Sequence, residues 1–216
     1  MMFRLQLIAV FSFMSLFLLL LVGAVILNDE SNQAEVLMTA PENCVGMCLL
    51  GIRPGKTTVR ESVTHLQNHR WVTDVIQNAP GNGYAEINWD WSGHQPSVID
   101  ASKRGRITFY YHEGDTSGIS LNDLVIQTMT IYTRIPIYAF QEWFGETSTG
   151  NVNNSIDGKL GYTVYYDVPG GIMILSTEMV CPVTIVSYWN AMTRMTVSIG
   201  NSKDPYINPS DMIRLC

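Results

Sequence analysis

The sequence has few charged residues, and basic residues are the scarcer kind. Charged residues make up 15% of the 216 residues, with 13 Lys and Arg against 19 Asp and Glu, and the formal net charge is −6. Binding to nucleic acid needs clustered Lys and Arg. The one short basic cluster, residues 103–106, is more typical of a solvated turn between strands. The composition therefore argues against a nucleic-acid partner.

Recognisable catalytic motifs are also missing. The chain contains no G-x-S-x-G motif and no glycine-rich phosphate loop. His65 and His69 are spaced like paired helical metal ligands, but Leu66 stands where a metalloprotease needs Glu. Carboxylates that could serve a glycosidase cannot be paired from their spacing: Asp90, Asp100, Glu113, Asp115 and Glu142. We therefore predict a protein that is not an enzyme, without metal or cofactor; a hydrolase acting on a wall polymer is the alternative.

One long apolar run stands at the start of the chain, at residues 5–27. As a helix it would cover about 34 Å, enough for a hydrocarbon core of about 30 Å. A cleaved signal peptide is the alternative, although its apolar stretch is usually only about 7–15 residues. Arg4 precedes the run, and Asp29 and Glu30 follow it. The positive-inside rule then predicts a single-pass membrane protein with a cytoplasmic N-terminus and an extracytoplasmic folded domain.

Four cysteines follow the apolar run, at Cys44, Cys48, Cys181 and Cys216. None forms a C-x-x-C pair, and outside the cytoplasm oxidation is more common than metal binding. The sequence does not choose among the possible pairings. Our first expectation is a disulfide between Cys44 and Cys48, because they are close together in a constrained turn.

The rest of the chain divides by composition into four further segments. After an anchor at 1–27 we expect a polar tether at 28–43, a first α+β unit at 44–134, a second α+β unit at 135–200 and an irregular tail at 201–216.

Each expected unit begins with a helix. Thr58 and Glu61 have the spacing of a capping box, and apolar residues recur behind them at helical intervals. Pro136 opens a second helix that Gly145 ends. Strands are expected where β-branched and aromatic residues gather: Tyr84–Trp91, Arg106–His112, Ile119–Ile131, Leu160–Asp167, Ile172–Met179 and Val183–Met192. A helix followed by three strands, twice, predicts an α+β fold of two helix-plus-antiparallel-sheet units, although residues 107–114 and 162–170 favour a competing alignment.

The stretch from residue 51 to 72 resembles the opening of the SmpA/OmlA (BamE-like) domain. The matching residues are Gly51, Pro54, Gly55, Thr57, Thr58, Val59, Val63 and Leu66. Residues 137–146 are similar to the helix that ends in Leu-Gly-x-Pro in the same domains. Tandem copies of this unit build the β-lactamase-inhibitor-protein-like fold. The resemblance implies a BamE/BLIP-like fold and a binding or assembly role in the cell envelope.

Aromatic residues are the best candidates for a binding surface. Trp89 and Trp91 alternate on one expected strand and so share a face, and Tyr111 lies on the next strand. Such residues either pack in the core or form an exposed strip suited to a protein or glycan partner. Taken together, the sequence predicts a non-catalytic binding or assembly module of the cell envelope. It would be held to the membrane by its N-terminal helix, with Trp89, Trp91 and Tyr111 contacting the partner.

Overall fold

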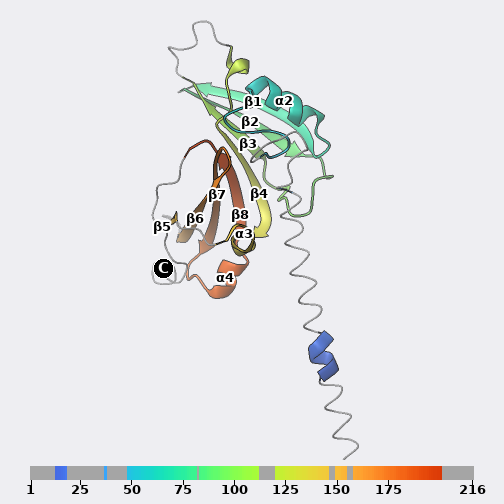
Figure 1. Cartoon of the computed structure of the whole chain (residues 1–216), viewed down its shortest axis with the longest axis vertical. Helices are drawn as coiled ribbons and strands as arrows, with labels where there is room; N and C mark the ends of the chain where they lie inside the picture. The colour runs from blue at the N-terminus through green and yellow to red at the C-terminus, as the bar shows by residue number, and fades with distance from the viewer. Residues whose placement is uncertain are drawn as a thin grey trace, which may run out of the picture.

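The computed structural model describes residues 13–18, 37, 48–81, 83–111, 120–145, 149–154 and 158–200 (Figure 1). Apart from a helical turn at 13–18, its elements in chain order are α2 (Val59–Asn68), β1 (Val72–Gly81), β2 (Tyr84–Trp91), β3 (Gly105–Tyr110), η1 (Leu121–Asp123), β4 (Thr128–Pro136), α3 (Ile137–Phe144), β5 (Thr149–Asn154), β6 (Lys159–Val168), β7 (Gly171–Val180), α4 (Ile185–Trp189) and β8 (Met192–Ser198).

The strands form one continuous sheet of eight, in the order β1-β2-β3-β4-β8-β7-β6-β5. All neighbouring strands are antiparallel. Strands β1 to β4 follow one another across one half of the sheet, and β5 to β8 follow one another across the other. The two halves meet where β4 pairs with β8, at the centre of the sheet (Figure 1).

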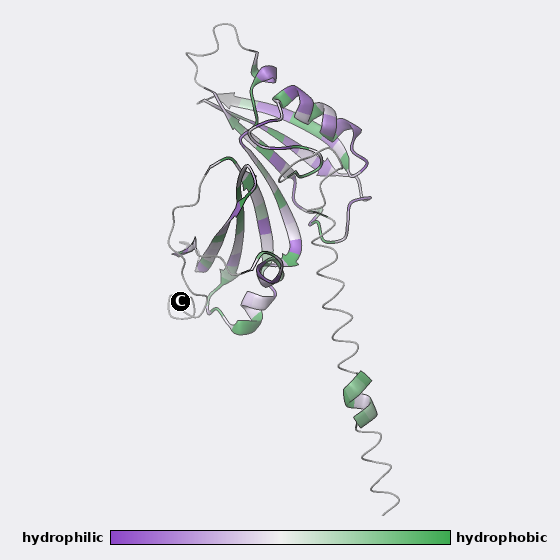
Figure 2. Cartoon of the chain, viewed as in Figure 1, coloured by the Kyte–Doolittle hydropathy of each residue, from purple (hydrophilic) through white to green (hydrophobic). Residues whose placement is uncertain are grey.

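One face of this sheet carries the core. Apolar and polar residues alternate along the strands, which is visible as banding in Figure 2 and as alternating burial in β2, β3, β4, β6 and β8. The register places the buried residues of neighbouring strands opposite one another, as in the row Ile107, Met129, Val197 and Met173. Helices α2 and α3 pack their apolar residues against the same cluster. The opposite face carries mainly polar side chains along β4 and β8, including Thr130, Arg194 and Thr196.

Both sequence-predicted helix boundaries are confirmed. Thr58 and Glu61 form the capping box of α2, since the Thr58 hydroxyl accepts from Glu61 N and the Glu61 carboxylate accepts from Thr58 N. Helix α3 begins after Pro136 and ends at Gly145, whose φ of 80° lies in the left-handed region that favours glycine.

The predicted fold class, two helix-plus-antiparallel-sheet units after a transmembrane helix, is wrong. The chain forms mainly one eight-stranded antiparallel sheet with short helices, and each half supplies four strands. The sequence predicted no strand at Thr149–Asn154 or at Val72–Gly81, where the structure has β5 and β1. The expected strand Val183–Met192 contains helix α4, and the strand that follows it, β8, begins only at Met192.

The predicted membrane anchor at residues 1–27 is also corrected. Across the ranges described above, no helix combines the length and the apolar character needed to cross a bilayer. The single-pass topology and the extracytoplasmic location rested on that helix, and the described part of the chain does not support them. Apart from residues 13–18, the predicted anchor lies outside the described residues, as does the tether at 28–43 except residue 37 and the whole tail at 201–216.

Candidate functional site

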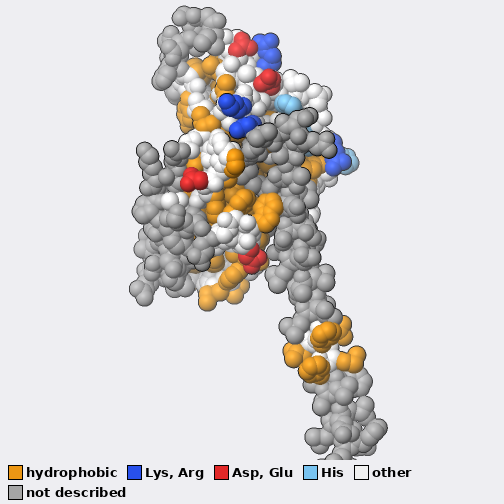
Figure 3. Space-filling model, viewed as in Figure 1, with side chains coloured by type: hydrophobic (Ala, Val, Ile, Leu, Met, Phe, Trp, Pro, Cys, Tyr) orange, Lys and Arg blue, Asp and Glu red, His pale blue; other side chains and the backbone are white. Residues whose placement is uncertain are grey.

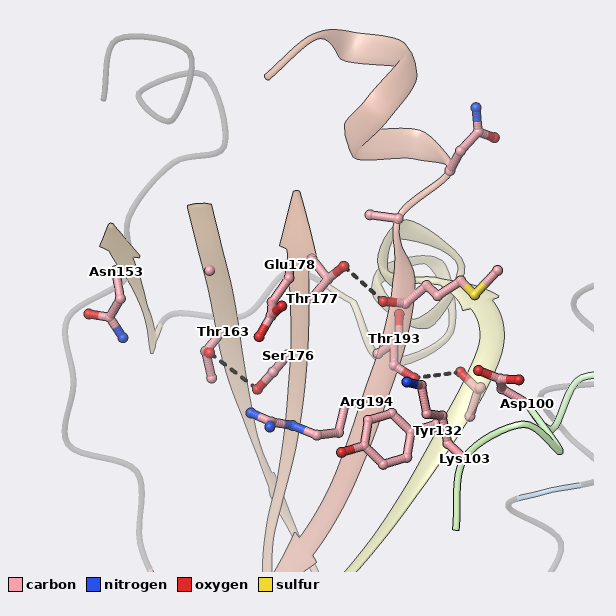
Figure 4. A pocket seen from close by; sticks show the side chains of 15 residues that line it. Asp100, Lys103, Tyr132, Asn153, Thr163, Ser176, Thr177, Glu178, Thr193 and Arg194 are labelled. Atoms are coloured by element: carbon pink, nitrogen blue, oxygen red, sulfur yellow. Dashed lines mark hydrogen bonds between the residues drawn. The ribbon is translucent and has the colours of Figure 1, made fainter. Parts of the chain in front are cut away.

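The polar face of the sheet is hollowed over strands β4 to β8. The hollow has a volume of about 760 Å³ (Figure 4). Its floor contains a row of cross-strand neighbours: Tyr132 on β4 lies opposite Arg194 on β8, Arg194 opposite Ser176 on β7, and Ser176 opposite Thr163 on β6. Side chains opposite one another on antiparallel strands lie about 4.5–5.5 Å apart and share a face. Four neighbouring strands of the sheet therefore present one continuous polar row.

A second row deepens the floor because its central residue has no side chain. Gly161 on β6 lies between Glu178 on β7 and Asn153 on β5. A Cβ atom added at Gly161 would meet only the Asn153 carbonyl oxygen, at 3.6 Å, which is ordinary van der Waals contact. The backbone therefore does not require glycine here, and the missing side chain leaves room in the hollow.

The loop between β2 and β3 forms one wall of the hollow. Strand β3 pairs with only the first part of β4. Further along β4, the loop forms the backbone hydrogen bonds instead: Asp100 N donates to Tyr132 O at 2.9 Å, and Arg134 N donates to Val98 O at 2.7 Å. The Trp91 indole Nε1 donates to Lys103 O at 2.8 Å. These bonds fix the loop so that Asp100 and Lys103 line the hollow.

The ion pair between Arg104 and Asp90 holds the same loop from its far end. The Arg104 guanidinium donates to both Asp90 carboxylate oxygens, at 2.8 and 3.0 Å. These hydrogen bonds raise the pKa of Arg104 above its ordinary value. Two contacts to β2 therefore hold this part of the loop. Trp91 binds the backbone of Lys103, and Asp90 binds the side chain of its neighbour Arg104.

The charged side chains of the hollow differ in whether they already have a hydrogen-bond or ion-pair partner. Asp100 Oδ1 accepts from Ser102 N and Ser102 Oγ, at 3.1 and 2.7 Å. Glu178 pairs with Lys159 at 3.6 Å. The side chains of Arg194 and Lys103, in contrast, form no ion pair with any residue that the structure describes. Both carboxylates of the hollow therefore have a described partner, whereas neither cation has a carboxylate partner among the described residues.

The described lining is rich in groups that form hydrogen bonds. Thr163 Oγ1 donates to Ser176 Oγ at 3.2 Å, so the two hydroxyls pair with each other and not with a base. Within the described ranges, no three His, Cys, Asp or Glu side chains gather as metal ligands would. Hydroxyl and amide groups can both donate and accept hydrogen bonds, and a guanidinium can donate them, to a polar ligand without reacting with it.

The three aromatic residues chosen from the sequence lie away from the floor of the hollow. Trp89 is 1% exposed and belongs to the core, where its indole covers Gly105 so closely that a Cβ there would overlap the ring. Trp91 and Tyr111 are half-buried against the core cluster. Trp89 is thus not available to a partner, and Trp91 contributes by holding the Lys103 loop.

The cysteine and histidine candidates are placed in part. Cys48 and Cys181 are both disulfide-bonded. Cys44 lies outside the described residues, so the Cys44–Cys48 pairing stays a prediction. His69 ends α2, and its Nδ1 accepts from Trp71 N at 3.2 Å. Burial, together with the positive charges of Arg70 and His65, lowers the pKa of His69.

Sequence reasoning missed the floor of the hollow. Arg194 fell outside every expected strand because the strand before it was placed at Val183–Met192. The alternation of exposed and buried residues along Met192–Ser198 was the signal that could have placed Arg194 on the open face. Tyr132, Ser176 and Thr163 carry no motif, and only the register brings them together.

A second surface feature lies around α4 and was also not foreseen. Exposed apolar side chains gather there, and Figure 3 shows orange side chains over α4 at the bottom of the part that holds the sheet: Val180, Ile185, Val186, Trp189 and Met192. Trp189 stacks edge-on against Tyr138 of α3, with ring centroids 4.2 Å apart. Nothing in the described part of the chain covers these side chains.

Comparisons with known proteins identify no relative. No family model matches the chain, and neither the curated proteins nor the solved structures contain a match. The resemblance to the SmpA/OmlA (BamE-like) domain is not borne out: no family model matches, and the chain forms a continuous eight-stranded sheet where that domain has a helix on a small sheet. The assignment to the cell envelope rested on this resemblance and on the membrane anchor, and it loses both supports.

Proposed function

We propose that this protein is a binding module without catalytic activity, and that its ligand is a polar molecule lying in the hollow over β4 to β8. The observation that carries the proposal is the polar row of Tyr132, Arg194, Ser176 and Thr163 on the floor of a hollow of about 760 Å³. Small-molecule sites commonly have volumes of about 300–1,000 Å³.

Binding is favoured over covalent catalysis by the partners of the hydroxyl groups. A nucleophilic Ser needs a base within hydrogen-bond reach. The hydroxyl of Ser176 instead accepts from Thr163, and none of the described residues that line the hollow is a His.

A hydrolase acting on a glycosidic bond is the second candidate. One observation favours it: Asp100 and Glu178 line the same hollow, and glycosidases use two carboxylates across the sugar. Against it, Asp100 accepts from Ser102 and Glu178 pairs with Lys159, so both carboxylates already have partners.

Filling the hollow tests the binding proposal. Gly161→Tyr puts a ring into the hollow at a position where a Cβ is tolerated, and tyrosine suits a strand. Thr108→Tyr is the matched control, because Thr108 lies on the same sheet face on β3, outside the hollow. Both variants and the wild-type chain are applied to a printed array of oligosaccharides and short peptides.

We expect Gly161→Tyr to lose the wild-type signals by at least about tenfold, with an unchanged thermal melt, and Thr108→Tyr to keep them. Wild-type signals that survive in Gly161→Tyr would place binding elsewhere and refute the proposal. Chromatography of the array's saccharides after incubation tests the second candidate. Cleavage that Asp100→Asn or Glu178→Gln abolishes would establish the hydrolase in place of the binding module.

A further inference from the structure

Arg194 occupies the centre of the hollow's floor and has an unused guanidinium. It lies between Tyr132 on one side and Ser176 on the other. In Figure 4 its side chain runs from β8 across β7 toward the hydroxyl pair of Ser176 and Thr163. Three other arginines of this chain, Arg60, Arg104 and Arg106, are paired with carboxylates. Arg194 has no such partner among the residues described.

A second cation approaches the same space from the wall. Figure 4 shows the Lys103 side chain reaching from the β2–β3 loop toward the sheet, next to Tyr132. Its backbone is fixed on both sides, since its N–H donates to Asp100 O at 3.1 Å and its carbonyl accepts from Trp91 Nε1. Two cations thus face the hollow, and neither is paired with the two carboxylates that also line it, Asp100 and Glu178.

The shape of a guanidinium selects the chemistry of its partner. Its planar fork of N–H donors matches the two oxygens of a carboxylate, and paired hydrogen bonds of this kind are stronger and more specific than neutral ones. The two carboxylates that line the hollow have other partners: Asp100 accepts a hydrogen bond from Ser102, and Glu178 forms an ion pair with Lys159. The group that completes Arg194 is therefore expected to come from the ligand.

The remaining lining fits a saccharide better than a peptide. Peptide partners gain most of their affinity from apolar and aromatic anchors in pockets, whereas Met192 is the one large aliphatic side chain among the described lining residues. Thr163, Ser176 and Asn153 both donate and accept, as sugar hydroxyls do. Tyr132 adds one aromatic ring beside them.

From these observations we propose that the hollow binds an acidic saccharide, with Arg194 holding a carboxylate of the sugar and Lys103 supporting it. The inference rests on the proposed binding function and names the ligand class of the same hollow. It predicts that the hollow binds a negatively charged saccharide more tightly than an uncharged one, which a hollow lined by neutral polar groups would not do.

The test compares one saccharide in two charge states. Calorimetric titration of the whole 216-residue chain with an oligogalacturonate, and with the same oligomer after methyl esterification of its carboxyls, isolates the contribution of the charge. A hexaglutamate peptide is the third probe. We expect the acidic sugar to bind at least about tenfold more tightly than the ester or the peptide, and its affinity to fall with added salt.

Variants then locate the anchor. Arg194→Gln should remove the preference for the acid over the ester, and Arg194→Lys, which keeps the charge without the fork, should restore only part of it. Lys103→Gln should reduce the preference less. Arg134→Gln is the matched control, because Arg134 is exposed on the same face of β4 but does not line the hollow, so its loss should leave the preference unchanged.

The outcomes separate this inference from the proposed function. Equal affinity for acid and ester would overturn the inference and leave the binding function standing. Hexaglutamate binding as tightly as the sugar would overturn the saccharide class. An equal effect of Arg134→Gln and Arg194→Gln would overturn Arg194 as the anchor. Failure of the acidic sugar to bind, while Gly161→Tyr still abolishes other array signals, would overturn the ligand class alone.

Discussion

At the scale of single residues, the packing of Trp89 in the core depends on the absence of a side chain at Gly105. The indole lies where a Cβ of Gly105 would be. Gly105→Ala should therefore force the ring or β3 to shift and lower the free energy of unfolding by about 1–3 kcal/mol, the usual cost of overpacking. Urea denaturation measures this. Gly161→Ala is the control, since its Cβ has room, and an equal loss there would contradict the explanation.

Two buried threonines at the β4–β8 pair have opposite hydrogen-bond states. Thr133 Oγ1 donates to Thr193 O at 3.0 Å, whereas the buried Thr193 Oγ1 has no partner among the described residues. Thr193→Val removes an unsatisfied hydroxyl and should raise the free energy of unfolding by about 1 kcal/mol, while Thr133→Val should lower it by about 1 kcal/mol. Denaturant melts of the two variants compare them directly. Shifts of the same sign would refute this account.

His69 should make the stability depend on pH. Burial lowers its folded-state pKa below the ordinary 6.5, so the unfolded chain binds the proton more readily. The contribution of His69 to stability is therefore present above pH 6.5 and is lost as the pH falls through 6.5 toward the folded pKa. His69→Asn keeps an acceptor for Trp71 N and does not titrate. Melting temperatures between pH 8 and about 5 should fall less in this variant; equal slopes would exclude His69 as the cause.

At the scale of elements, α2 is stabilised at its start by the capping box of Thr58 and Glu61. Thr58→Ala should reduce the free energy of unfolding by about 1 kcal/mol because the N–H groups of the first turn lose their acceptor. Thr64→Ala, in the exposed middle of the same helix, should not destabilise the protein, since alanine is the better helix former. Thermal melts of the two variants distinguish a loss of the cap from a general effect of removing threonine.

The sequence predicted the elements whose signals are local and missed those whose role depends on position in the sheet. The capping box, Pro136 and Gly145 act within one turn of chain, and β2, β6 and β7 alternate clearly. Strand β5 (Thr149–Asn154) is polar and lies at the edge of the sheet, where it pairs with one neighbouring strand only. Its sequence therefore lacks the apolar alternation that marks the inner strands. The hollow could not be predicted, because Arg194, Ser176 and Thr163 meet only through the register of strands β6 to β8.

At the scale of the whole molecule, one core cluster runs through both halves of the sheet. It includes Ile87 from β2 and Val164 from β6, and the central β4–β8 pair joins the halves by seven residue pairs, from Thr128 to Pro136 on β4. Unfolding should therefore be a single cooperative transition in which the calorimetric and van't Hoff enthalpies agree. Two separate heat-absorption peaks, or an Ile87→Ala variant that destabilises only part of the protein, would show that the halves fold independently.

The hollow draws its residues from both sides of that central pair. Lys103 and Tyr132 belong to the first half of the chain, whereas Ser176 and Arg194 belong to the second. Neither half, made as a separate fragment divided after Gly145, would carry the complete set. Ligand binding would then report that two complementary fragments had come together, so this fold offers the basis of a split sensor whose signal is switched on by reassembly.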